Sequence, residues 1–246
     1  MIRAEAGRPA GLRYDLGVPR AGATSRALTA LQTEHRSCHR CVDAGFIPSA
    51  LPVFSGNASQ RVLLVGQAPG PVEVDQSRPF AGRAGKQLMR WFVRAGFAGE
   101  GDVRARVYMT AMTTCFPGRR ADGAGDRRPS GREVALCSPW LDALLDVLRP
   151  RLILPVGGLA LSRFLPGKSL DDVIGSAYAL SGELLKSPPP SSPVLLPLPH
   201  PSGQSRWLND PDRAALLDKA LRRLADLVKW AEDASPRSGI GAEAMV

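Results

Sequence analysis

The sequence predicts an α/β fold: a single domain with a central four-stranded parallel sheet flanked by helices. Four apolar runs of strand length alternate with helical stretches along 246 residues, an order typical of parallel sheets covered on both faces. The hydrophobic content of 44% is that of an ordinary globular core. We therefore expect one domain over residues 25–233, between a flexible N-terminal arm (1–24) and a disordered C-terminal tail (234–246).

Each element has its own signal. The predicted strands cover 61–66, 106–113, 151–157 and 193–199. The predicted helices cover 25–38, 84–97, 131–148, 158–165 and 210–233. In the last of these, Asp210 can cap the first turn, Pro211 suits the first helical position, and leucines follow at helical spacing.

The net charge of +9 and the pI of about 10 favour an acidic partner, with nucleic acid as the first choice. The arginines are scattered along the chain, so a general bias in composition explains the charge equally well. No apolar run approaches the roughly 20 residues of a membrane span, and the N-terminus has no signal-like apolar region. We expect a cytoplasmic monomer without a membrane partner.

Four segments follow the predicted strands, at the edge where parallel sheets place their ligands. They read "GQAPGPVEVD", "TTCFPG", "GGLAL" and "HPSG". The first could bind phosphate on backbone N–H groups, but it lacks the Lys-Ser/Thr ending of a P-loop and the spacing of a dinucleotide fingerprint. In the last, His200 stands between two prolines that restrict the backbone on both sides.

Four cysteines, Cys38, Cys41, Cys115 and Cys137, complete the set of motifs. In a cytoplasmic protein they favour metal binding or catalysis over disulfides. "GQAPG" with "RPFAGRAG", the "HPSG" segment and this cysteine pattern together resemble the uracil-DNA glycosylase superfamily, closest to its iron–sulfur branches, families four and five. The resemblance covers about residues 35–230.

The resemblance implies a monofunctional glycosylase of DNA repair that flips a damaged base out of DNA and hydrolyses its bond to deoxyribose. His200 would donate a hydrogen bond to O2 of the leaving uracil, and Phe80 would stack on the base. Gln67 and Ala68 would contact the base through backbone N–H groups. Glu73 would position water or oppose the cationic sugar, with Asp75 as the alternative.

The same resemblance implies that the four cysteines hold one [4Fe–4S] cluster at the sheet edge, with a structural zinc ion as the alternative. The cluster would hold the N-terminal segment against the polar loop 117–130, whose Arg119 and Arg120 would then lie near phosphates. Ser202 is assigned to the substrate site. Arg206 and Trp207 are assigned to a loop that enters the DNA stack, although Trp207 could instead pack on the last helix.

Two residues depart from the family pattern. Gln67 stands where many members of the fourth family have glutamate. Ala111 stands where many have the asparagine that reads the uracil edge. The missing amide at Ala111 leaves excision of other deaminated bases open. Ala68 stands where the cluster-free uracil enzymes have their catalytic aspartate. Ala68 and Ala111 give weight to an alternative, a cluster-bearing DNA-binding protein with little or no catalysis.

Overall fold

The computed structural model describes residues 21–189, 193–202 and 206–233. Its sheet has the strand order β2-β1-β3-β6-β4-β5. The strands are β1 (Val62–Gly66), β2 (Val107–Ala111), β3 (Leu152–Pro155), β4 (Ala177–Ala179), β5 (Leu184–Leu185) and β6 (Val194–Leu195). β2, β1, β3 and β6 are parallel to one another, and they correspond to the four predicted strands.

The prediction of a four-stranded sheet was wrong, because the sheet has six strands. β4 pairs antiparallel with β6, and β5 pairs antiparallel with β4, so a hairpin extends the parallel sheet. These strands have three and two residues, which is too short for an alternating pattern to stand out in a sequence.

Prolines determine where the hairpin stops pairing with β6. The N–H groups of Val194, Leu196 and Leu198 donate to carbonyls of residues 151, 153 and 155, on the β3 side. The intervening residues face β4, and this pairing ends at Leu195. Pro197 and Pro199 occupy the next two such positions, where they have no N–H to offer a neighbouring strand. The chain therefore leaves the sheet just before His200.

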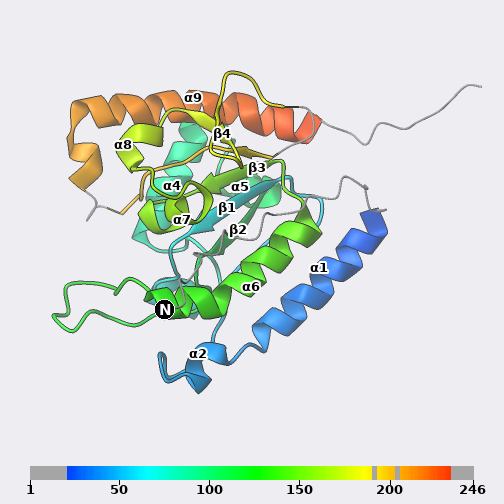
Figure 1. Ribbon diagram of the computed structural model, residues 1–246, viewed down its shortest axis with the longest axis vertical. Coiled ribbons are helices and arrows are strands. Elements are labelled where there is room, and N and C mark those ends of the chain that lie inside the picture. Colours follow the sequence, from blue (N-terminus) through cyan, green and yellow to red (C-terminus); the bar gives the residue numbers. More distant parts are fainter. Residues whose placement is uncertain (1–20, 190–192, 203–205, 234–246) are drawn as a thin grey trace, which may run out of the picture.

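The helices cover the sheet on both faces. They are α1 (Ala21–Arg36), α2 (Arg40–Asp43), α3 (Pro71–Asp75), α4 (Arg83–Arg94), α5 (Glu100–Arg106), α6 (Gly131–Leu148), α7 (Gly158–Phe164), α8 (Leu170–Val173), α9 (Pro211–Asp233) and the 3₁₀ turn η1 (Arg206–Asn209). Figure 1 shows α9 on one side of the sheet and α6, with α1 beside it, on the other. No helix of the described ranges is long and apolar enough to cross a membrane.

The first helix begins at Ala21, before the predicted domain boundary at residue 25. The division into arm, domain and tail stays a prediction. Residues 1–20 and the predicted tail 234–246 lie outside the described part of the chain. The four parallel strands are buried along their length, which explains their continuous apolar runs.

Candidate active site

The carboxyl ends of the parallel strands bring three of the predicted segments together. Gly66, the last residue of β1, is in register with Ala111, the last residue of β2. Beyond β3 and β6, an isolated parallel bridge joins Val156 to Leu198, two residues before His200. The "GQAPG", "TTCFPG" and "HPSG" segments therefore leave the same edge of the sheet, as the sequence predicted.

His200 is held from two sides. Its ring lies against Gly157, the residue after Val156 of this bridge. A Cβ atom built on Gly157 would be 3.1 Å from Cδ2 of His200. The backbone N–H of Ser202 donates to Nδ1 at 3.3 Å, and the Ser202 hydroxyl lies 3.0 Å from the same nitrogen. Ser202 thus contacts the histidine, whereas its assignment to substrate stays a prediction.

These contacts define the protonation of the ring. A backbone N–H can only donate, so Nδ1 of His200 is an acceptor, and the hydrogen of the neutral ring lies on Nε2. Burial lowers the pKa of His200 below its usual value, which favours the neutral form. Nε2 has no hydrogen-bond partner in the ranges that the structure describes. Among the described residues, Nε2–H of His200 is therefore a donor without a partner.

Glu73 is bonded to the backbone through both carboxylate oxygens, and its water-positioning role stays a prediction. Its Oε1 accepts the N–H of Gly82 at 2.6 Å, and its Oε2 accepts the N–H of Gly70 at 3.0 Å. The carboxylate thus joins the loop after β1 to the turn that follows Phe80. Asp75, the alternative, is exposed at the end of α3.

Phe80 lies over the end of β1. A Cβ atom on Gly66 would be 2.8 Å from Cζ of the ring, so the ring is close to this strand end. The backbone of Phe80 has φ of 55°, which is unusual for a residue other than glycine. Arg104, which the sequence analysis missed, holds this turn by donating to the carbonyl of Pro79 from both terminal nitrogens at 3.1 Å.

The loop between β1 and α3 keeps backbone donors available. Gln67 accepts the N–H of Thr113 through its carbonyl at 3.2 Å, but within the described residues no hydrogen bond uses the N–H of Gln67 or Ala68. Ala111 is 8% exposed and places only a methyl group at the end of β2. Ala111 therefore supplies no polar group in place of the amide that many family members have at this position.

The residues assigned to DNA entry separate into two cases. Trp207 is 9% exposed, and its indole N–H donates to Oδ1 of Asp171 at 2.7 Å. Arg213 of α9 lies over the same ring, 5.9 Å from its centroid. Trp207 is thus packed in the protein, which is the second of the two placements that the sequence left open. The side chain of Arg206 lies outside what the structure describes.

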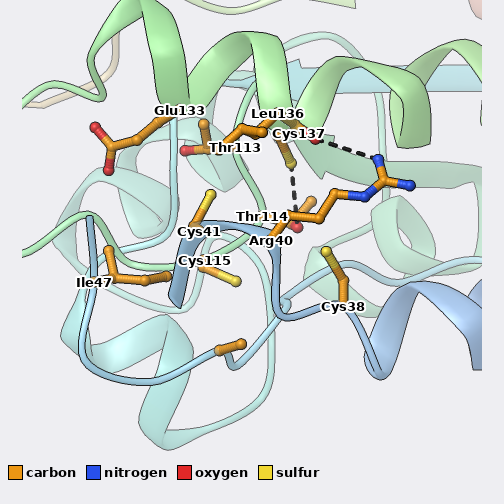
Figure 2. Close-up of a pocket in the computed structure, with 11 residues that line it drawn as sticks. Cys38, Arg40, Cys41, Ile47, Thr113, Thr114, Cys115, Glu133, Leu136 and Cys137 are labelled. Carbon is orange, nitrogen blue, oxygen red and sulfur yellow. Dashed lines mark hydrogen bonds between the residues drawn. The ribbon is translucent and has the colours of Figure 1, made fainter. Parts of the chain in front are cut away.

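The four cysteines line one pocket (Figure 2). Cys38 and Cys41 come from the α1–α2 region, Cys115 follows β2, and Cys137 lies on α6. All four are free thiols. Burial is the main cause that raises the pKa of Cys41 to about 11 and that of Cys115 to about 12. Within the described residues, no group of three or more metal-binding side chains is arranged around a single ion.

Polar side chains contact two of these sulfur atoms. The indole N–H of Trp140 donates to Sγ of Cys38 at 3.2 Å. The hydroxyl of Thr114 lies 3.7 Å from Sγ of Cys137 and 2.9 Å from Nε2 of His35. Thr113 also lines the pocket, and its buried hydroxyl has no hydrogen-bond partner in the part of the chain that the structure describes.

A column of stacked groups supports this pocket. His35 stacks on Phe54 at a centroid distance of 4.7 Å and on Trp140 at 4.6 Å. Arg36 lies over Phe54, and Arg40 lies over Trp140. Burial lowers the pKa of His35 to about 4, so the central ring is neutral at neutral pH. The sequence analysis missed this column because the residues come from distant segments and their pairing depends on the fold.

The loop 117–130 is attached beside the cysteines by an ion pair between half-buried Arg127 and buried Glu133. Both terminal nitrogens of Arg127 donate to the Glu133 carboxylate at 2.7 Å, and Glu133 is 3% exposed. Arg127 also donates to the carbonyl of Phe46 at 3.3 Å. The pair holds the pKa of Glu133 at about 2. The predicted contact between this loop and the N-terminal segment is therefore present, through a bond that the sequence analysis did not identify.

Comparison with known proteins now identifies the family. The sequence model described as Uracil DNA glycosylase superfamily matches residues 53–225. The chain belongs to this superfamily. The matched range contains β1, β2, β3 and β6, together with Phe80 and His200 at the strand ends. The resemblance that the motifs indicated is confirmed.

Individual relatives point to the same branches. A type-4 uracil-DNA glycosylase of Sulfurisphaera tokodaii is 31% identical over 131 residues, which are 53% of this chain and 54% of the relative. A type-4 enzyme of Thermotoga maritima is 33% identical over 118 residues, 48% of this chain and 56% of the relative. A type-5 enzyme of Pyrobaculum aerophilum is 31% identical over 115 residues, 43% and 48% of the two chains. The matched segments span about half the length of these relatives.

Proposed function

We propose that this protein is a monofunctional DNA glycosylase that flips uracil out of DNA and hydrolyses its bond to deoxyribose. The observation that carries the proposal is the state of His200, a half-buried neutral ring beyond the end of β6 whose Nε2–H has no partner among the described residues. Family membership and the named type-4 and type-5 relatives support the same reaction.

The chemistry follows from the charge that develops as the bond breaks. The leaving base takes the electron pair of the glycosidic bond, and negative charge accumulates on its O2 atom. Nε2–H of His200 donates to that oxygen, and the N–H groups of Gln67 and Ala68 are further donors at the same edge of the sheet. A preorganised donor of this kind contributes a factor of about 100–1000 to the rate.

Phe80 holds the flipped base in this proposal. Its ring lies beside the end of β1, and its turn is held by Arg104 and Glu73. Stacking a base on an aromatic side chain contributes about 1–3 kcal/mol. The ring is positioned before substrate arrives, so the base meets a preformed surface.

We further propose that the cysteines hold one [4Fe–4S] cluster. The donor set fits, because four free thiols line one pocket, where an indole N–H donates to Sγ of Cys38 and a hydroxyl lies 3.7 Å from Sγ of Cys137. The unpartnered hydroxyl of Thr113 in the same pocket also suits a sulfide-rich ligand. When bound, the cluster would supply structural cross-linking between the α1–α2 region and α6. Iron and sulfide analysis distinguishes it from the alternative, a single structural zinc ion.

DNA carrying the damaged base is the proposed partner. The net charge of +9 supports electrostatic binding to phosphates, which falls as salt rises. The loop 117–130 contributes exposed arginines at positions 119, 120 and 128. Figure 1 shows this loop projecting from the start of α6.

The small side chain of Ala111 favours a pocket that accepts deaminated bases besides uracil. An amide at this position would form a directional pair with the uracil edge, whereas a methyl group selects only by shape. We therefore include hypoxanthine and xanthine among the proposed substrates.

The test uses purified cluster-containing protein and labelled DNA with one uracil, hypoxanthine or xanthine, followed by alkali to break the strand at abasic sites. Excision of uracil supports the proposal, and excision of the purines as well supports the wider pocket. His200→Ala should lower the rate about 100- to 1000-fold while DNA binding is retained. Intact protein that binds DNA and excises none of the bases would contradict the proposal and support the non-catalytic alternative, which Ala68 and Ala111 favour.

A further inference from the structure

The proposed reaction leaves one role without a residue. Breaking the bond between base and sugar gives the sugar ring the character of a cation, and a carboxylate usually opposes that charge or accepts a proton from the attacking water. Neither Gln67 nor Ala68 carries a carboxylate. Three acidic side chains of the described chain belong to the segments around this loop, namely Glu73, Asp75 and Asp126.

Glu73 is committed to the fold. Each of its oxygens accepts a backbone N–H, one from Gly70 and one from Gly82. These bonds hold the loop and the Phe80 turn together, so a rotation toward substrate would break both. Asp75 lies at the exposed end of α3, and its side chain has no contact with the strand ends among the described bonds.

Asp126 reaches the same loop from a distant part of the chain. Its Oδ2 lies 3.1 Å from the position that a Cβ atom on Gly70 would take, and Oε2 of Glu73 lies 2.9 Å from that position. Only a glycine allows this approach, because any side chain at position 70 would displace one of the carboxylates. The long loop 117–130 therefore delivers an acidic group to the segment after β1.

The loop is rigid where it carries Asp126. The next residue, Arg127, forms the buried pair with Glu133, and its N–H donates to the carbonyl of Gly118 at 2.9 Å. An antiparallel bridge joins Asp126 to Arg119 across the loop. These contacts hold the backbone that carries the Asp126 carboxylate.

The oxygens of Asp126 remain available. No described residue donates a hydrogen bond to them, and their one ion pair, with Arg119, has a separation of 3.8 Å. The side chain is 40% exposed, so water reaches it. This state contrasts with Glu73, whose oxygens are both occupied.

We propose that Asp126 is a catalytic carboxylate of this glycosylase, an inference that rests on the proposed function. A water molecule bonds through its oxygen to C1′ of the deoxyribose and transfers one proton to Asp126. The bond between C1′ and the base breaks, and the base leaves with the electron pair while His200 donates a hydrogen bond to its O2. The proton then passes from Asp126 to solvent, and the products are the free base and an abasic site.

The test measures single-turnover excision of uracil by the full-length, cluster-containing protein, with DNA affinity determined separately. Asp126→Asn should lower the rate at saturating enzyme about 100-fold or more, the range typical of a general base. Its DNA affinity should be unchanged or higher, because a negative charge near the phosphates is removed. Asp122→Asn is the matched control, an exposed carboxylate of the same loop paired with Arg120, and should keep the wild-type rate.

A second variant tests the chemistry directly. Asp126→Ala should regain part of its lost rate when formate is added, because a small carboxylate can occupy the vacated position, and chloride at equal ionic strength should give no gain. An Asp126→Asn rate within about twofold of wild type would overturn the inference. So would a rate loss accompanied by a lower melting temperature or lower iron content, or one explained entirely by weaker DNA binding. A wild-type protein that excises no base overturns the proposed function itself, which separates the two failures.

Discussion

The strand-end site and the cysteine pocket are built in different ways. At the strand ends, Ser202 holds His200 through one ring nitrogen, and Arg104 holds the Phe80 turn through the carbonyl of the preceding proline. Nε2 of His200 has no partner among the described residues. In the cysteine pocket, the rings of His35 and Trp140 are covered on both faces by other groups. Residues of the first region should therefore affect the rate, and residues of the second should affect the stability.

The largest effect on stability should come from the pair that joins the loop 117–130 to the pocket. Glu133→Gln keeps the shape of the side chain but leaves Arg127 without its carboxylate, which we expect to lower the free energy of unfolding by about 3 kcal/mol. Urea denaturation measures the change. Asp218→Asn, which removes an exposed partner of Arg94, is the control and should change it by less than about 0.5 kcal/mol. If the two variants lowered the free energy of unfolding equally, the burial of Glu133 would not increase the contribution of its ion pair to stability.

Acid should remove the same contribution in the wild-type protein. The Arg127 guanidinium holds the pKa of Glu133 at about 2, below its usual 4.5. A carboxyl with a lowered pKa stabilises the fold above the unfolded pKa, and this stabilisation is lost as the pH falls through the folded pKa. The difference in unfolding free energy between wild type and Glu133→Gln should therefore be constant above about pH 5 and shrink toward pH 2. A difference that does not depend on pH would contradict the assignment.

The contrast between the two regions also explains which features the sequence could predict. The parallel strands, α6 and the strand-end motifs depend on local patterns, and Gly131–Leu148 agrees with its predicted range. The hairpin of β4 and β5 pairs too few residues to give a recognisable pattern in the sequence. The sequence around Trp207 is compatible both with packing on α9 and with entry into DNA, so it could not distinguish the two. The approach of Asp126 to Gly70 joins segments more than fifty residues apart, so it depends on the folded loop.

Within the strand-end site, Phe80 offers a smaller and selective effect. Phe80→Leu keeps an apolar side chain but loses the flat ring, and the loss of about 1–3 kcal/mol of stacking should lower single-turnover excision about 5- to 100-fold. Phe164→Leu is the control, because this ring is 8% exposed in the core on α7. We expect the control to lower the melting temperature with little change in rate. If Phe80→Leu instead lowered the melting temperature and left the excision rate unchanged, Phe80 would be a packing residue.

The smallest effect should come from one hydrogen bond in the cysteine pocket. Trp140→Phe retains a ring that can stack on His35 but removes the N–H that donates to Cys38, a bond that contributes about 1 kcal/mol. We expect the melting temperature to fall by about 2–4 °C and the visible absorbance of the proposed cluster to decay faster in air. Trp230→Phe is the control, since this indole packs under Arg151, away from the cysteines, and should leave the decay rate unchanged. If both variants lose the absorbance at the wild-type rate, the hydrogen bond from Trp140 to Sγ of Cys38 does not stabilise the pocket, and stacking alone does so.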